Sequence, residues 1–394
     1  MMKTRTFAIP LVGLLALSLA GCASIGDSLS TGFGLWGGKD SSEKPAPLPE
    51  IKQSMAVKIQ WQAGVGAAGD YVFTPVVSGG SVYAAGAGAI TRLDADSGKQ
   101  LWRVETSKKL SAGVGVGEGL VLVGTPKGEV LAYDLDGKEV WQARVSSEVL
   151  SAPQAAEGIV VVRSVDGQIF GLGARDGKRK WVYQRPLPSL AIRSYDGVVL
   201  TRGAVFAGYA GGKLVALSLA NGNLGWEASV AQPRGATELE RIADVTSPPL
   251  VDGNRICAVA YQGRVACFEV VNGNPLWARE MSSISGLAQD QSYLYVSDAK
   301  GAVHALDKSS GASIWKQDKL LNRHLTAPLA RGNYLAVGDL EGHVHFLARE
   351  DGSFAARVAT DGSAIGAPPL ALGQDMLVQT RNGGVFAISS EGFR

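Results

Sequence analysis

The stretch "VYAAGAGAITRLDADSGKQLW", Val82–Trp102, decides the fold because it holds one copy of a repeat that recurs along the chain. It reads as a strand, a glycine turn, a second strand, an Asp/Gly turn and a third strand that carries Trp. The glycine turn follows the pattern Gly-x-[Val/Ile/Leu] and predicts the middle hairpin of each repeat. The pattern occurs eight times, with spacings of 40, 39, 45, 51, 38, 41 and 41, at Gly88, Gly128, Gly167, Gly212, Gly263, Gly301, Gly342 and Gly383.

A second pattern, Gly-x-x-x-Trp, marks the strand that closes each repeat. It occurs at Gly98/Trp102, Gly137/Trp141, Gly177/Trp181, Gly222/Trp226, Gly273/Trp277 and Gly311/Trp315. The seventh copy has Gly352 followed by Ala356 in place of Trp, and no Trp strand follows the eighth hairpin. We predict that these Trp side chains pack between neighbouring repeats. The alternative is a stripe that stacks on sugars or a cofactor, but recurrence at one position favours packing.

The incomplete last repeat predicts how the chain closes. Repeats of about 40 residues with four strands are typical of propeller blades. Trp61 lies 41 residues before Trp102, in step with the repeat. A strand around Trp61 therefore completes the last blade beside "GVFAISS", residues 384–390. The predicted fold is all-β: an eight-bladed β-propeller of four-stranded antiparallel blades, closed by the N-terminal strand.

The composition agrees with this fold and argues against one class of partner. The 394 residues include 51 Gly, and only 19% are charged, which indicates many tight turns between short strands. The formal net charge is +2, and without Lys3 and Arg5 it falls to 36 basic against 36 acidic residues. There is no run of Lys or Arg, so we do not expect nucleic acid to be a partner.

The N-terminus predicts export and a lipid anchor. Lys3 and Arg5 precede a short apolar run that ends in "LAGC", Leu19–Cys22. This pattern resembles the lipobox of bacterial lipoproteins, which implies that Cys22 is lipidated and becomes the first mature residue. The absence of Asp after Cys22 then implies the outer membrane, facing the periplasm, with the membrane contacted through the lipid only. We expect a signal peptide at 1–21, a lipidated Cys and flexible tether at 22–50, and the propeller at 51–394.

Few residues suggest chemistry. Cys257 and Cys267 flank the turn at Gly263, and two free buried thiols are slightly favoured over a disulfide because cross-strand geometry is demanding. His343 and His345 share one strand face, and a solvated face is favoured over a metal site. No catalytic Gly-x-Ser-x-Gly or phosphate-binding loop occurs. No catalytic residue, metal or cofactor is therefore expected.

The blade pattern is similar to that of the pyrroloquinoline-quinone propeller dehydrogenases, which is the enzyme alternative. In that family, adjacent cysteines, a calcium ion and a stacking Trp hold the quinone. This chain has no adjacent cysteines. A cell-wall-binding propeller is a third possibility and would need exposed aromatic side chains, for which Tyr195, Tyr209 and Tyr261 are candidates.

Two insertions interrupt the ring and predict its functional face. The first loop is "YQRPLPSLAIRSYDG", residues 183–197, and the second loop is "SVAQPRGATELERIADVTSPP", residues 229–249. Each follows a Trp strand and precedes the next blade, so we expect them to lie side by side on one face. An alternative is that both plug the channel mouth. A protein interface is favoured because Arg185 and Arg193 border apolar residues in the first loop. The predicted contacts include Leu187 there, and Glu240 and Arg241 in a predicted helical turn of the second loop.

With these loops, the chain resembles the BamB family, lipoproteins of the bacterial β-barrel assembly machinery. Lipobox, tether, eight blades and the loop cores "PSLAIR" and "ATELERIADV" match in order. The resemblance implies a non-enzymatic scaffold that binds the POTRA domains of the central subunit, BamA, and aids delivery of unfolded outer-membrane proteins. It implies contacts by Leu190, Ile192, Arg193 and Asp244; a second acidic residue common in the family is replaced here by Thr246. Strand addition of a client to a free blade edge is a further possibility.

Overall fold

Eight antiparallel sheets of four strands each are built from residues 44–390, the part of the chain that the computed structural model describes. The predicted signal peptide and Cys22 lie outside the described residues. Short runs rich in Val, Ile, Leu and aromatic residues form the strands, and Gly and Asp turns end them. Within residues 44–390, no helix is long and apolar enough to cross a membrane.

Each blade runs from an innermost strand to an outermost strand. The innermost strands are β2 (Val76–Ser78), β6 (Gly115–Gly117), β10 (Gln154–Ala156), β14 (Val198–Thr201), β18 (Leu250–Asp252), β22 (Leu287–Gln289), β26 (Leu329–Arg331) and β30 (Leu370–Leu372). The second strands are β3 (Ser81–Gly86), β7 (Leu120–Gly124), β11 (Ile159–Arg163), β15 (Ala204–Tyr209), β19 (Arg255–Val259), β23 (Tyr293–Ser297), β27 (Tyr334–Gly338) and β31 (Asp375–Gln379). The third strands are β4 (Ala89–Asp94), β8 (Glu129–Asp134), β12 (Ile169–Gly173), β16 (Lys213–Ser218), β20 (Arg264–Glu269), β24 (Val303–Asp307), β28 (His343–Ala348) and β32 (Gly384–Ser390). The outermost strands are β5 (Gln100–Glu105), β9 (Glu139–Arg144), β13 (Arg179–Tyr183), β17 (Leu224–Ser229), β21 (Pro275–Glu280), β25 (Ser313–Gln317), β29 (Phe354–Ala359) and β1 (Val57–Gly64).

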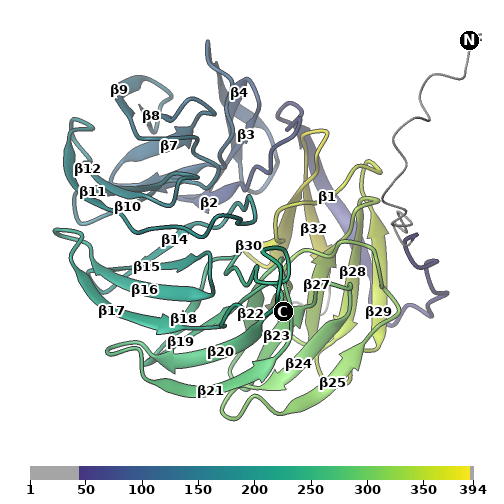
Figure 1. The fold of residues 1–394 in the computed structure, drawn as a ribbon. Helices are drawn as coiled ribbons and strands as arrows, with labels where there is room; N and C mark the ends of the chain where they lie inside the picture. The colour runs from purple at the N-terminus through teal and green to yellow at the C-terminus, as the bar shows by residue number, and fades with distance from the viewer. Residues whose placement is uncertain (1–43, 391–394) are drawn as a thin grey trace, which may run out of the picture. The chain divides into compact units, whose positions relative to one another are not determined.

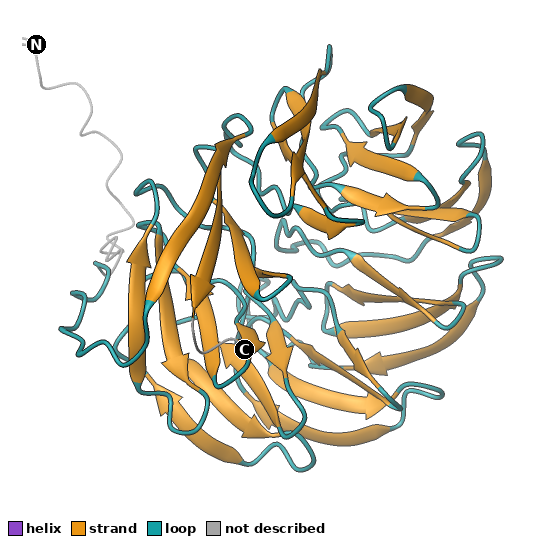
Figure 2. Ribbon diagram, turned by 180° about the vertical axis from the view of Figure 1, so that it is seen from behind, coloured by secondary structure: helices purple, strands orange, loops and turns teal. Residues whose placement is uncertain are grey.

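The ring closes as predicted. Strand β1 pairs antiparallel with β32, and Trp61 lies opposite Ala387. The innermost strands β2 and β30 of the first and last blades also contact each other. Figures 1 and 2 show the blades following one another around a central axis, and Figure 1 shows β1 beside β32 in the last blade. The fold prediction, an eight-bladed propeller closed by the N-terminal strand, is confirmed.

The repeated Trp residues pack between blades, which explains the Gly-x-x-x-Trp pattern. The ring of Trp61 covers Gly98 of the next blade so closely that a Cβ on this glycine would lie 2.4 Å from the ring. Gly98 also has a φ of +68°, which favours glycine. Each indole N–H donates to a carbonyl of the next blade: Trp61 to Ala95, Trp102 to Leu135, Trp141 to Ala174, Trp181 to Leu219, Trp226 to Val270, Trp277 to Lys308, and Trp315 to Arg349.

The missing Trp of the seventh blade has a structural reason. A Trp at position 356 would have to cover the turn between the third and fourth strands of the eighth blade. No such turn exists, because β32 and β1 come from opposite ends of the chain. Ala356 is fully buried there and packs in a cluster with Met55. Ser54 donates its backbone N–H to the carbonyl of Ala355, 2.9 Å away, so the segment before β1 covers this position.

The start of the described chain lies along the propeller. The backbone N–H of Ala46 donates to the Leu321 carbonyl at 2.9 Å, and the Ala46 carbonyl accepts from Nη1 of Arg323 at 2.9 Å. The Pro49 carbonyl accepts from Nη2 of Arg357 at 3.1 Å. Residues 44–50, predicted as the end of a flexible tether, are therefore held by hydrogen bonds to the seventh blade and the loop before it.

The two cysteines of the propeller form a disulfide, so the preference for free thiols was wrong. Cys257 on β19 and Cys267 on β20 are directly opposite in the antiparallel ladder, with Cα atoms 4.1 Å apart, and their sulfur atoms are bonded. Both side chains are buried. Closely spaced opposite residues of a hairpin supply the short separation that a cross-strand bond requires.

Candidate functional site

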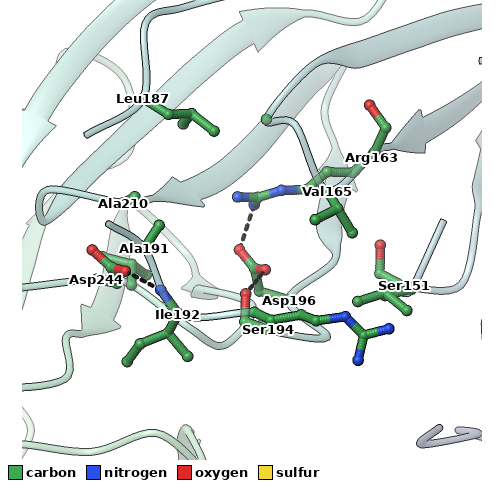
Figure 3. Close-up of a pocket in the computed structure, with 15 residues that line it drawn as sticks. Ser151, Arg163, Val165, Leu187, Ala191, Ile192, Ser194, Asp196, Ala210 and Asp244 are labelled. Atoms are coloured by element: carbon green, nitrogen blue, oxygen red, sulfur yellow. Dashed lines mark hydrogen bonds and ion pairs between the residues drawn. The ribbon is translucent and has the colours of Figure 1, made fainter. Parts of the chain in front are cut away.

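The first and second loops lie side by side, as predicted. The first loop joins β13 to β14, and the second joins β17 to β18. The backbone N–H of Ile192 in the first loop donates to Oδ2 of Asp244 in the second, at 2.7 Å. Figure 3 shows this hydrogen bond beside the ion pair that holds the end of the first loop. Two segments 52 residues apart in sequence are therefore in direct contact.

Asp244, predicted at the partner surface, is a buried residue that joins the two loops. Its side chain is only 3% exposed. Oδ1 accepts from the backbone N–H of Gly211, 2.9 Å away in the middle hairpin turn of the fourth blade. The Asp244 carbonyl accepts from the N–H of Tyr261 at 2.8 Å. Thr246, at the position where an acidic residue is common, is also buried.

A buried ion pair fixes the end of the first loop. Asp196 is 5% exposed, and its Oδ2 lies 2.5 Å from Nη1 of Arg163 on β11. Ser194 donates its hydroxyl to the other carboxylate oxygen. Burial raises the pKa of Asp196, while Arg163 and the Ser194 hydrogen bond act in the opposite direction. Arg163 also donates to the Gly208 carbonyl at 2.6 Å, so the pair joins the first loop to the third and fourth blades.

The second half of the first loop reaches the connections of other blades. Nη2 of Arg193 lies 2.8 Å from Oε1 of Glu148, in the connection between the second and third blades. The Tyr195 hydroxyl donates to the Asp70 carbonyl at 2.9 Å, and the Arg193 guanidinium lies 5.8 Å from the ring centre of Tyr71. Asp70 and Tyr71 precede the first blade. This part of the loop thus fits the plug alternative, because it spans from the third blade to the start of the first.

The tip of the first loop is exposed. Leu190 is 43% exposed, and Arg193 is exposed beside its ion pair with Glu148. Ile192 is half-buried. Leu187 is also half-buried and packs against the core between the third and fourth blades, where its methyl groups cover Gly167. The predicted contact residues therefore divide into an exposed tip and a supporting side chain, Leu187.

The second loop contains the single predicted helical turn. The Arg241 N–H donates to the Thr237 carbonyl at 3.2 Å. The Glu240 carboxylate accepts from the N–H groups of Ala236 and Thr237 at 2.9 and 3.0 Å. These hydrogen bonds lower the pKa of Glu240, and the bond from Thr237 has the largest effect. Glu240, Arg241 and Leu239 are exposed, Leu239 to 67%. The turn presents an apolar side chain between charged ones.

Sequence reasoning missed the residues that hold the loops. Glu148, Arg163 and Asp196 support the first loop, and Asp70 accepts from its Tyr195. No spacing rule could find them, because each lies outside the repeat pattern and meets its partner only after the blades have formed.

The prediction of a solvated strand face for His343 and His345 was wrong for His345. His345 is fully buried, and its Nε2 lies 2.9 Å from Oδ2 of Asp339. Its Nδ1 accepts from Nε of Arg357 at 3.1 Å, so the neutral ring donates from Nε2. Oδ2 of Asp339 also accepts a hydrogen bond from Nε of Arg323, at 2.7 Å. No group of three or more potential His, Cys, Asp or Glu metal ligands occurs among residues 44–390.

The tyrosines proposed for a cell-wall-binding surface do not form an exposed face. Tyr209 is fully buried, with the guanidinium groups of Arg163 and Arg185 at 4.8 and 5.1 Å from its ring centre. Tyr195 and Tyr261 are half-buried. Tyr195 uses its hydroxyl within the protein, as described above.

Comparison with known proteins identifies a family. Residues 86–317 match the family model described as outer membrane protein assembly factor BamB. A protein of that name from Bordetella pertussis is 44% identical over 383 residues, covering 97% of this chain and 96% of its own. One from Nitrosomonas eutropha is 48% identical over 396 residues, covering 98% and 95%.

Solved structures agree with the fold. The crystal structure of BamB from Moraxella catarrhalis superposes with a TM-score of 0.79 at 24% identity, covering 85% of this chain and all of that chain. The quinohemoprotein alcohol dehydrogenase from Comamonas testosteroni has a TM-score of 0.70 at 14% identity, covering 86% and 77%. At these identities the structures show a shared propeller fold and carry no information on activity.

Proposed function

This chain belongs to the BamB family of outer membrane protein assembly factors, and we propose that it is a non-enzymatic scaffold of the β-barrel assembly machinery. In this role it binds the POTRA region of the central subunit, BamA, and aids the folding and insertion of outer-membrane proteins. The proposal is supported by near full-length similarity to proteins of that name and by the two contiguous loops.

The contiguity of the two loops is the observation that carries the docking assignment. Loops are the usual binding elements of a rigid scaffold. In the first loop exposed Leu190 is near Arg193 in sequence, and in the second loop exposed Leu239 immediately precedes Glu240 and Arg241. An apolar centre with a charged border is typical of protein interfaces. We assign direct contact to Leu190, Ile192, Arg193, Glu240 and Arg241, with Leu187 and Asp244 beneath them.

The N-terminal sequence supports the location that we propose. Cleavage after residue 21 would leave Cys22 as a lipidated first residue, holding the propeller at the periplasmic face of the outer membrane. The stretch from Cys22 toward residue 50 would serve as the tether, although its last residues, 44–50, contact the propeller.

The quinone-dehydrogenase alternative is less well supported. The resemblance requires adjacent cysteines, whereas Cys257 and Cys267 are separated by ten residues and face each other across a hairpin. The disulfide between them lies within one blade.

Co-purification with BamA tests the docking assignment. Leu190→Glu or Arg193→Glu, made in the full chain, should abolish recovery of BamA from detergent-solubilised envelopes. Leu101→Glu is the matched control, because Leu101 is 49% exposed on β5, outside both loops. All three variants should keep the unfolding transition of the wild type. Normal BamA recovery with both loop variants would refute the docking assignment.

A further inference from the structure

The position of Asp244 suggests a role different from that of a contact residue. We propose that Asp244 is a positioning residue: from the second loop, it holds the first loop in the conformation that docks, without touching the partner. The inference rests on the proposed function and assigns a division of labour within the same surface.

The geometry of Asp244 leaves little carboxylate for a partner. Oδ2 accepts from Ile192 at 2.7 Å, and Oδ1 accepts from Gly211 at 2.9 Å. The side chain is 3% exposed, so a partner that reached it would first have to displace the first loop. Both oxygens therefore serve backbone N–H groups within the protein.

The hydrogen bond from Ile192 to Asp244 fixes the backbone of the first loop next to its exposed tip. Ile192 lies between exposed Leu190 and the anchored stretch that contains Arg193 and Asp196. The anchors at Glu148 and Arg163 lie on the C-terminal side of Ile192, where they fix residues 193–196. Asp244 thus fixes the backbone on the C-terminal side of Leu190, and Leu187 packs on its N-terminal side.

Gly211 extends the same contact to the blade. It lies in the turn between β15 and β16, with a φ of +74°. The Asp244 carboxylate therefore joins three segments: the first loop, the second loop and a rigid hairpin of the fourth blade. A loop fixed before binding loses less conformational freedom on docking, which strengthens affinity without any added contact.

Two substitutions separate the positioning role from a contact role. Asp244→Ala removes both acceptors. Asp244→Asn preserves shape but leaves a single carbonyl oxygen for two N–H donors, and it provides a second variant if the first does not fold. Asp136→Asn is the matched control, because Asp136 is an exposed carboxylate in the turn between β8 and β9, outside both loops.

The experiment measures the free protein as well as the complex. Amide hydrogen exchange of the full chain in detergent reports on the N–H groups of Ile192 and Gly211, and a titration with purified BamA gives the affinity. With Asp244→Ala, we expect faster exchange at both amides in the absence of BamA. We also expect roughly 10- to 100-fold weaker binding, because a charge-assisted hydrogen bond of the docking conformation is lost. Asp244→Asn should show smaller changes of both kinds, and Asp136→Asn should show neither.

The possible failures can be told apart. Weaker binding with unchanged exchange at Ile192 would overturn the positioning role and indicate direct contact. Faster exchange with unchanged affinity would also overturn it, because the conformation held by Asp244 would then not matter for docking. In either case Leu190→Glu decides separately whether the docking surface itself is correct.

Discussion

The backbone N–H of Ile192 lies 2.7 Å from Oδ2 of Asp244, and this one hydrogen bond joins the two insertions of the propeller. Both residues were expected at a partner surface, and the structure gives them different positions. Ile192 is half-buried at the tip of the first loop, whereas Asp244 is buried beneath it. We therefore expect Asp244 to affect docking through the conformation of the first loop, in which it holds the Ile192 N–H.

A Trp introduced at the seventh blade should destabilise the protein. Ala356→Trp restores the repeat pattern, but Ala356 is fully buried and the eighth blade has no turn to receive an indole. We expect a loss of about 1–3 kcal/mol in the free energy of unfolding from overpacking. Urea unfolding measures it. Trp315→Ala provides the reference for a correctly placed Trp and should lose about 3–5 kcal/mol. A gain in stability with Ala356→Trp would contradict our explanation of the missing residue.

Reduction of the disulfide should weaken the propeller. The bond joins residues ten apart in sequence, and closing a short loop of this kind contributes about 2–3 kcal/mol in the chain-entropy model. Urea unfolding of the wild type with and without a thiol reductant should reveal this difference. The double variant Cys257→Ala/Cys267→Ala should unfold at the same urea concentration with and without the reductant. Equal wild-type stability in both conditions would show that the bond adds nothing.

The buried His345 should make stability depend on pH. Burial lowers the pKa of His345, and Arg357 and Arg323 lower it further, while Asp339 opposes them. In the unfolded chain the His345 ring has a pKa near the ordinary 6.5, so it binds a proton at a higher pH than it does in the native protein. Stability should therefore fall as pH drops below 6.5, by up to about 1.4 kcal/mol per pH unit, until the folded-state pKa is reached.

Two variants isolate this effect. His345→Gln removes the titrating ring and should flatten the dependence of the unfolding free energy on pH between 7 and 5. His324→Asn, at an exposed position, should leave that dependence unchanged. Urea titrations at each pH provide the comparison. If His345→Gln keeps the wild-type slope, another group is responsible.

The sequence by itself determined the propeller. Glycine and Trp recurring at fixed positions set the number of blades, and Trp61 in step with the repeat predicted that β1 would pair with β32. These features can be recognised in the sequence because each blade packs on the next with the same residue types at the same positions. The structure added the reason for the pattern: each glycine makes room for the Trp of the preceding blade, as Gly98 does for Trp61.

The positions and the neighbouring placement of the two loops were also predicted from the sequence, because both insertions fall at the same point of adjacent blades. What only the tertiary structure decided is which side chains face outward and which hold the loops. Asp244 meets Ile192 across 52 residues, and Arg193 meets Glu148 across 45. Such pairs follow no sequence repeat, because their residues come within hydrogen-bond distance only after the blades have assembled around the axis.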